Sequence, residues 1–233
     1  MKDLAVIIPL YNEEELIKST IDSCLKELNC LGICYDLFVL NDGSTDNSEK
    51  VLKTIAEKSS NLFIMNKPNS GHGPTILKGY KLAAKNYEWI FQIDSDNEMS
   101  IEDFHKLWNK RNEYDFLIGK RTNREQSFLR KLMSIASRLC VRLFYGKGPS
   151  DVNSPYRLMK SEKFVELFHK IPQNTFAPNV IISGYVGMKK LNLYETNVIH
   201  LSREHGTSSI KISNFISVAI KSFLQIISFR FYI

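Results

Sequence analysis

Short apolar runs alternate with longer stretches of helical periodicity along the first half of the chain. The runs Leu4–Leu10, Tyr35–Leu40 and Leu62–Met65, and a fourth that starts at Trp89, each end at polar or turn-forming residues. This pattern is typical of buried strands that open into loops. Between the runs, apolar spacing predicts helices that begin near Glu13, at Ser44–Asp46, at Thr75 and at Ser100.

This order of elements predicts the fold class. Strand and helix alternate four or five times within the first 120 residues, which is typical of βαβ units. We therefore predict one Rossmann-like α/β domain with a mostly parallel central sheet flanked by helices. Right-handed crossovers would bring the strand ends at Asn12, Asp42 and Asp94 to one edge of the sheet. We also expect the acids Glu13–Glu15 in the first turn of a helix, where the helix dipole favours negative charge.

The second half of the chain differs in composition and contains longer amphipathic stretches. The predicted elements are a short strand at Phe116–Ile118, a helix over Ser127–Tyr145, a strand ending near Lys160, a helix over Lys163–Lys170, a strand over Leu191–His200 and an amphipathic helix over Ile212–Ile233. We divide the chain into a domain of residues 1–211, with halves 1–119 and 120–211, and a C-terminal amphipathic helix of residues 212–233.

The positive charge of the chain is concentrated in one region. The net charge is +6, and residues 120–147 contain eight basic residues against one acid, Glu125. Such a charge favours anionic partners. The basic side of the 127–145 helix is either a solvated face or a surface for anionic lipid or phosphate. A nucleic-acid partner is disfavoured because the basic residues lack interleaved surface aromatic residues.

Cysteine usage and hydropathy bear on location. The four cysteines form no Cys-x-x-Cys pair and have no His at zinc-finger spacing, which disfavours a metal knuckle. We interpret them as reduced thiols of a cytosolic protein. No signal-peptide pattern opens the chain, and no uncharged stretch reaches the roughly 18 to 20 residues that a membrane span needs. We expect a cytoplasmic protein that lies at the membrane surface. The 212–233 helix would dock on lipid, on its own domain, on a second copy of the chain or on a membrane protein, and the sequence leaves these partners open.

The stretch Trp89–Glu98 carries the most distinctive candidate chemistry. An apolar run ends there at Asp94 and Asp96, with Glu98 two residues further on. Open α/β sheets usually bind ligands at the carboxyl ends of their strands, and grouped carboxylates suit Mg²⁺ or Mn²⁺ bound together with substrate phosphates. Taken alone, an Asp-x-Asp sequence is common, and it favours a simple turn before a helix capped by Ser100 over a metal site.

Three motifs at successive strand ends give this stretch a specific interpretation. They are Pro9–Glu13 (Pro-Leu-Tyr-Asn-Glu), Asn41–Asp46 (Asn-Asp-Gly-Ser-Thr-Asp) and Asp94–Asp96 (Asp-Ser-Asp). In this order and spacing they resemble the inverting family 2 glycosyltransferases. The resemblance extends to the branch that makes polyprenyl (dolichyl) phosphate sugars. The segments that carry this extension are Gly119–Arg121, Arg130–Ser134, Asp151–Arg157 and Arg203–Lys211.

The resemblance implies a GT-A fold and a nucleotide-sugar donor site. Pro9, Tyr11 and Glu13 would cradle the base and ribose, and Asp42 would hold the edge of a uracil or guanine. The remaining implied contacts to the metal, the ribose and the diphosphate come from Asp94, Ser95, Asp96, Glu98, Arg203 and Lys211. Among these, Asp94, Asp96 and Glu98 would be the metal ligands, and Asp96 would also be catalytic.

The resemblance also implies an acceptor site in the second half. Arg121, Arg130, Ser134 and Arg157 would bind the acceptor, and Asp151 would orient it or act as a weak base. A lipid phosphate needs no strong base, because the second pKa of a phosphomonoester is about 6 and its oxygen is already largely anionic near neutral pH. A sugar hydroxyl would instead need a general base, with Asp151 or Glu98 as candidates.

The expected activity is metal-dependent transfer of a hexose from a UDP- or GDP-sugar to polyprenyl phosphate at the cytoplasmic membrane face. Two alternatives stay open, namely transfer to a sugar hydroxyl of a growing polysaccharide or glycolipid and a non-catalytic nucleotide-sugar-binding subunit. The chain departs from the family pattern at three places, of which the second favours the non-catalytic alternative. They are Asn41 before Asp42 where relatives commonly have Asp, Gly206–Ser209 (Gly-Thr-Ser-Ser) where they have Gly-x-Ser-Lys, and Pro155-Tyr156 where they have Gly-Phe.

Overall fold

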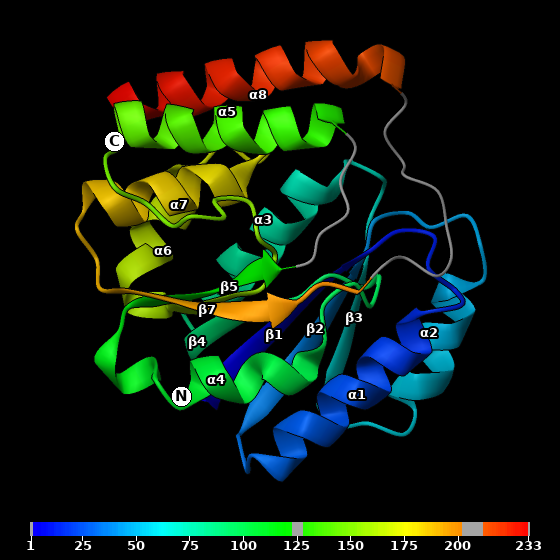
Figure 1. Cartoon of the computed structure of the whole chain (residues 1–233). Coiled ribbons are helices and arrows are strands. Elements are labelled where there is room, and N and C mark those ends of the chain that lie inside the picture. Colours follow the sequence, from blue (N-terminus) through cyan, green and yellow to red (C-terminus); the bar gives the residue numbers. More distant parts are fainter. Residues whose placement is uncertain (1, 123–127, 202–211, 233) are drawn as a thin grey trace.

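The computed structural model describes the backbone of residues 2–122, 128–201 and 212–232 (Figure 1). Its centre is a seven-stranded sheet with the strand order β3-β2-β1-β4-β6-β5-β7. The strands are β1 (Lys2–Leu10), β2 (Tyr35–Asn41), β3 (Leu62–Asn66), β4 (Tyr87–Gln92), β5 (Phe116–Thr122), β6 (Arg157–Lys160) and β7 (Leu193–Ile199). The α-helices are α1 (Ile17–Cys30), α2 (Ser48–Ala56), α3 (His72–Ala83), α4 (Phe104–Trp108), α5 (Phe128–Phe144), α6 (Ser161–Lys170), α7 (Pro178–Met188) and α8 (Ile212–Tyr232).

The sheet is mostly parallel, as predicted. β1 pairs in parallel with β2 and β4, β2 pairs in parallel with β3, and β5 pairs in parallel with β7. Only β6 runs against its neighbours β4 and β5 within the described sheet. The carboxyl ends of β1, β2 and β4 therefore meet at one edge, where the polar residues after each strand gather as predicted.

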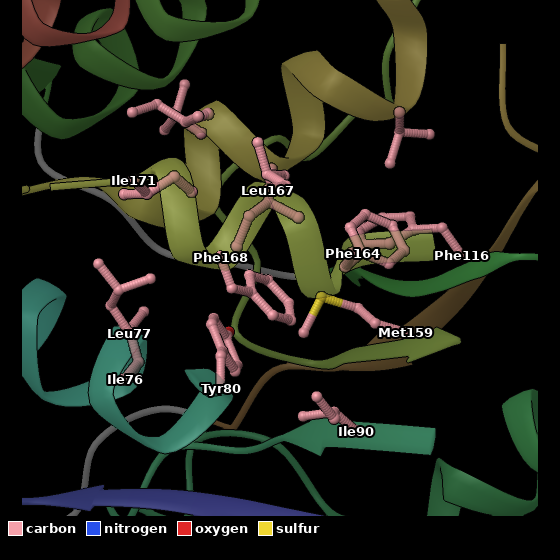
Figure 2. Packing of buried hydrophobic residues seen from close by; sticks show 14 of the residues in the cluster. Ile76, Leu77, Tyr80, Ile90, Phe116, Met159, Phe164, Leu167, Phe168 and Ile171 are labelled. Carbon is pink, nitrogen blue, oxygen red and sulfur yellow. The ribbon is translucent and has the colours of Figure 1, made fainter. Parts of the chain in front are cut away.

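Alternating side chains of the strands build a separate core on each face of the sheet. Leu4, Val6 and Ile8 of β1 face α1, α2 and α4, whereas Ala5 and Ile7 face α3 and the helices of the second half. The second core is rich in aromatic residues, and Figure 2 shows Tyr80 of α3 against Phe168 of α6, with ring centroids 5.1 Å apart. This period-two alternation of fully buried residues is what a central strand covered on both faces requires.

Several predicted boundaries differ from the structure. α1 begins at Ile17, so Glu13–Glu15 form a turn before the helix instead of its first turn. The predicted helix over Ser100–Arg111 is broken into a 3₁₀ turn at Ile101–Asp103, the short α4 and a second 3₁₀ turn. α3 begins three residues before Thr75, at His72. α7 was not predicted, because eight of its eleven residues are buried and it lacks an amphipathic period.

An outer pair of helices covers the second core. α5 and α8 lie side by side, farthest from the sheet, above α7 (Figure 1). The Tyr145 hydroxyl donates to the carbonyl of Ile226, and Arg230 Nε donates to the carbonyl of Phe144 at 2.8 Å. The C-terminal helix is thus present as predicted and docks on its own domain. Among the described residues, no helix is both long and apolar enough to cross a bilayer.

The contact between α3 and the sheet gives a stability prediction. A Cβ at Gly79 would lie 2.5 Å from Ile7 Cγ2, so Gly79→Ala would overpack this helix against β1. We expect the free energy of unfolding to fall by about 1–3 kcal/mol, measured by urea denaturation. Leu82→Ala, on the exposed side of the same helix, is the control and should change it by less than about 0.5 kcal/mol. Equal stability of Gly79→Ala and the wild type would contradict the close packing.

Candidate functional site

The loops after β1 and β2 interlock at the carboxyl edge of the sheet. The backbone N–H of Thr45 donates to Asn12 Oδ1 at 2.7 Å, and the N–H of Asn12 donates to Ser44 Oγ at 3.0 Å. Two further N–H groups, those of Glu13 and Glu14, donate to side chains of the second loop. These contacts hold Asn12, Glu13 and Glu14 against the segment that follows β2, and α1 begins after them, at Ile17. They place the first two motifs side by side.

Of the residues predicted to cradle the base, the structure leaves Tyr11 accessible. Its side chain is 40% exposed, whereas Pro9 is buried as part of β1. Glu13 follows Tyr11 in the segment before α1, and its side chain is half-buried.

The carboxylate of Asp42 holds the loop that leads into α3. Oδ1 accepts the N–H of Ser70 and Oδ2 accepts the N–H of Gly71, both at 2.8 Å, and Lys67 Nζ pairs with Oδ1. Asp42 is buried, with 3% of its surface exposed. In this structure both oxygens, which are predicted to hold the edge of a base, bond to the 67–71 loop.

Asp94 lies at the end of β4 between two side chains that the sequence did not single out. Gln92 Nε2 donates to its Oδ1 at 3.1 Å, and His72 Nε2 lies 3.0 Å from the same oxygen. Burial would raise the pKa of Asp94, but the charge and hydrogen bond of His72, the bond from Gln92 and the charge of Arg121 lower it overall. For His72, desolvation opposes the charges of Asp94, Asp96 and Asp42, and the net effect is a raised pKa. The site therefore favours an ionised Asp94.

Asp94, Asp96 and Glu98 line one small pocket together with Arg121. Glu98 pairs with His200, whose Nε2 lies 3.0 Å from Glu98 Oε2. In the described part of the chain, no three His, Cys, Asp or Glu side chains form a group able to hold a metal ion. The three predicted ligands thus line one pocket without forming such a group in this structure. Asp94 and Asp96 still fit a hard cation that takes one or two carboxylates and completes its shell with water and phosphate oxygens.

Ser95, predicted as a donor contact, is buried between the two aspartates, with 6% of its surface exposed. Its carbonyl accepts a hydrogen bond from Thr20 Oγ1 of α1 at 3.1 Å. This bond fixes the backbone between Asp94 and Asp96 to the first helix.

Arg121 and Asp151 form a bidentate ion pair beside the carboxylates. Nε of Arg121 lies 2.8 Å from Asp151 Oδ2, and its second nitrogen, Nη2, lies 2.9 Å from Oδ1. Both residues line a neighbouring cavity of about 140 Å³ with Lys120, Ser134 and Arg138. The structure thus brings three of the predicted acceptor-site residues, Arg121, Ser134 and Asp151, to one cavity next to Asp94 and Asp96.

Arg157, also predicted to bind the acceptor, lies beneath this cavity and is completely buried. Its guanidinium donates to the carbonyls of Val152, Ser154 and Asn179, and burial lowers its pKa to about 10. It therefore stays charged at neutral pH and supports the 151–157 loop from below. Direct contact with an acceptor would require that loop to open.

Some predicted residues lie outside what the structure describes. These are Arg203 and Lys211, together with the side chain of Arg130. Conversely, two residues of the site, His72 and Gln92, have little signal in the sequence. His72 stands between two glycines, just before the predicted start of a helix at Thr75. Gln92 is a single polar residue in an apolar strand, two positions before Asp94 and on the same face.

The sequence model of a family described as "Glycosyl transferase family 2" matches residues 5–180. An undecaprenyl-phosphate 4-deoxy-4-formamido-L-arabinose transferase from Pectobacterium carotovorum is 28% identical over 222 residues. The enzyme of that name from Yersinia pestis is 25% identical over 221 residues. Each alignment covers 94% of this chain but only 65% of the relative.

Solved structures give the same fold. Glucosyl-3-phosphoglycerate synthase from Mycobacterium tuberculosis, in complex with Mn²⁺, UDP-glucose and phosphoglyceric acid, superposes with a TM-score of 0.70 at 16% identity. The superposition covers 98% of this chain and 80% of that one. S. aureus TarS residues 1–349, in complex with UDP, gives 0.58 at 18% identity, covering 98% and 65% of the two chains. At these identities the likeness concerns the fold alone, and it confirms the predicted GT-A architecture.

The buried guanidinium gives a prediction for the cavity floor. Arg157→Lys keeps the positive charge but cannot reproduce the fork that bonds three carbonyls. We expect the free energy of unfolding to fall by about 3 kcal/mol in urea denaturation, since buried carbonyls lose their donors. The exposed Arg138→Lys is the matched control and should stay within about 0.5 kcal/mol of the wild type. If both variants unfold alike, the three bonds do not support the loop.

Proposed function

The chain belongs to glycosyl transferase family 2, and from that premise we propose that it transfers a sugar from a nucleoside diphosphate to a polyprenyl phosphate at the membrane surface. The observation that carries the proposal is the adjacency of two pockets. Asp94 and Asp96 line one, Asp151 lines the other, and Arg121 lines both. The chain spans 65% of the length of the undecaprenyl-phosphate transferases that it matches, and we propose that it shares their type of acceptor.

The first pocket is proposed to bind the donor. Transfer builds negative charge on the departing nucleoside diphosphate, and Mg²⁺ or Mn²⁺ supplies compensating charge there when bound. Asp94 and Asp96 would hold that cation, and the ionised state of Asp94 suits this role. Tyr11 would contact the base, and Ser95 would fix the spacing of the two aspartates through its bond to Thr20.

The second pocket is proposed to bind the acceptor phosphate. Lys120 and Arg138 add positive charge to the cavity that Arg121 and Ser134 line. A phosphate oxygen would attack as an anion, so Asp151 would not act as a strong base. In this proposal the carboxylate of Asp151 orients the Arg121 fork, and the acceptor phosphate engages the guanidinium from its open side. A sugar hydroxyl would instead need Asp151 as a general base.

The transferred sugar and the nucleotide belong to the proposal as well. The sequence suggested a hexose, but the named relatives act on a 4-deoxy-4-formamido-L-arabinose, which is a pentose derivative. We therefore propose a UDP- or GDP-linked sugar without assigning its ring size. UDP is in the complexes of both structural neighbours, which favours testing uridine donors first.

The outer helices are proposed to rest on the cytoplasmic face of the membrane. Neither α5 nor α8 contains an acidic residue, and basic residues lie on both. Large apolar side chains are exposed along them, namely Leu132, Ile135, Leu139, Leu143, Ile220, Leu224, Phe231 and Tyr232. A surface of apolar residues flanked by basic residues binds anionic membranes, because the apolar side chains insert at the interface and the basic ones attract anionic headgroups. All four cysteines are free thiols, in keeping with the cytoplasmic side.

Asp96→Asn tests the donor site. Loss of one carboxylate charge should lower sugar transfer to polyprenyl phosphate about 100-fold or more with UDP- or GDP-sugars and Mn²⁺, while the unfolding transition stays in place. Asp22→Asn, which removes an exposed charge on α1, is the control and should keep full activity. Substantial transfer by Asp96→Asn would refute the role of Asp96.

The same assay separates the alternatives. Release of nucleoside diphosphate only with saccharide acceptors would favour transfer to a hydroxyl. Binding of the nucleotide sugar without release of nucleoside diphosphate, whichever acceptor is added, would favour a non-catalytic subunit. Chelation of divalent metal with EDTA should stop transfer, and Mn²⁺ or Mg²⁺ should restore it.

Substitution of exposed apolar residues tests membrane docking. Leu139, Leu143 and Leu224 changed together to Ser should weaken binding to phosphatidylglycerol vesicles at least about tenfold in a sedimentation assay, because buried apolar surface contributes to the affinity. Deleting α8 would be a poorer test, since Ile226 and Phe229 are buried in the core. The control is Phe63→Ser with Leu82→Ser, both exposed and away from α5 and α8. Unchanged vesicle binding by the triple variant would exclude this surface.

A further inference from the structure

A buried polar network lies directly behind Asp94. It consists of Tyr80 on α3, Gln92 at the end of β4 and Asn179 in the first turn of α7. All three side chains are buried, with at most 2% of their surface exposed. In the interior, a polar group without a hydrogen-bond partner destabilises the fold by about 1–3 kcal/mol, so these three side chains must bond to one another or to their neighbours.

The network fixes which end of the Gln92 amide faces Asp94. Gln92 Oε1 accepts from Asn179 Nδ2 at 2.9 Å and from the Tyr80 hydroxyl. Since the oxygen is held by two donors, the amide nitrogen is the end that points to Asp94 Oδ1, 3.1 Å away. In the reverse orientation the Gln92 carbonyl oxygen would face the Asp94 carboxylate, and two acceptors would repel each other. The Gln92 amide nitrogen would then face two donors, Asn179 Nδ2 and the Tyr80 hydroxyl.

Each member of the network is itself held in place. Tyr80 stacks on Phe168, and burial raises the pKa of its phenol, which therefore keeps its proton and can donate. Its hydroxyl also lies 2.9 Å from Asn179 Oδ1. The carbonyl of Asn179 accepts from Arg157 Nη1 at 3.0 Å, which ties the network to the floor of the second pocket. Elements from both halves of the chain thus converge on one amide.

We propose that Gln92 is a positioning residue for the donor site, held by Tyr80 and Asn179 so that its amide N–H fixes the Asp94 carboxylate through Oδ1. The other oxygen, Oδ2, then meets the cation or the nucleotide in one orientation. Gln92 touches no substrate and acts through Asp94. This inference rests on the proposed function, since it assigns a support to the donor site.

Gln92→Met tests the inference because it keeps the length of the side chain and removes its amide. Tyr80 and Asn179 can still bond to each other in this variant, so the fold is expected to survive. Affinity for UDP or GDP with Mn²⁺, measured by titration calorimetry, should fall about tenfold or more, as expected for losing a hydrogen bond to a charged group. Tyr80→Phe keeps the ring stack and the bond from Asn179 to Gln92, and should weaken the affinity in the same direction but by less.

Ser183→Ala is the matched control. Ser183 is also fully buried, and it bonds the carbonyl of Val152 without contacting Gln92 or Asp94. It should lower thermal stability while leaving nucleotide affinity unchanged. Combined with Asp94→Asn, Gln92→Met should add no further loss, because the residue through which it acts has been altered.

These measurements separate failure of the positioning role of Gln92 from failure of the proposed donor site. If neither nucleotide binds the wild type, or Asp94→Asn binds as tightly as the wild type, the proposed donor site is wrong and the inference falls with it. If Asp94→Asn weakens binding but Gln92→Met does not, or if Ser183→Ala weakens it equally, only the positioning role is overturned.

Discussion

The antiparallel pairing of β4 with β6 is the constraint on which the candidate site depends. It sets Gln92 opposite Arg157 and inserts a strand of the second half between β4 and β5. The loop before β6 and the end of β5 therefore reach the carboxyl end of β4. Asp151 and Arg121, separated from Asp94 by 57 and 27 positions in the sequence, come to lie beside it only through this pairing.

Buried polar groups replace apolar packing where the two halves meet. Away from the site, aliphatic and aromatic side chains cover the sheet on both faces, and Figure 2 shows the core on the face of α3 and α6. Beneath the two pockets, Arg157, Gln92, Tyr80 and Asn179 are bonded to one another or to backbone carbonyls. Such groups are stable in the interior only when every donor and acceptor is matched, and matching them fixes one arrangement of the pocket floor.

The outer helices α5 and α8 combine a buried apolar side with an exposed apolar side. α5 and α8 bury Ile226, Phe229 and Cys140 against the domain, yet leave leucines exposed on the outside without a single acidic neighbour on either helix. This outer layer lies on the side of α7 away from the sheet (Figure 1). If this layer rests on lipid as proposed, the cavity proposed for the acceptor, which Ser134 and Arg138 of α5 help to line, would lie close to the lipid surface.

The sequence by itself determined the order of strands and helices, the mostly parallel sheet, the edge at which Asn12, Asp42 and Asp94 gather, and the family. Local periodicity and strand-end motifs carry that information because they are properties of neighbouring residues. It did not determine that Arg157 is a buried support, that Glu98 pairs with His200, that His72 and Gln92 flank Asp94, or that α7 exists. Each of these depends on contacts between distant segments, and a charged or amide residue has the same local pattern whether tertiary packing buries it or leaves it in solvent.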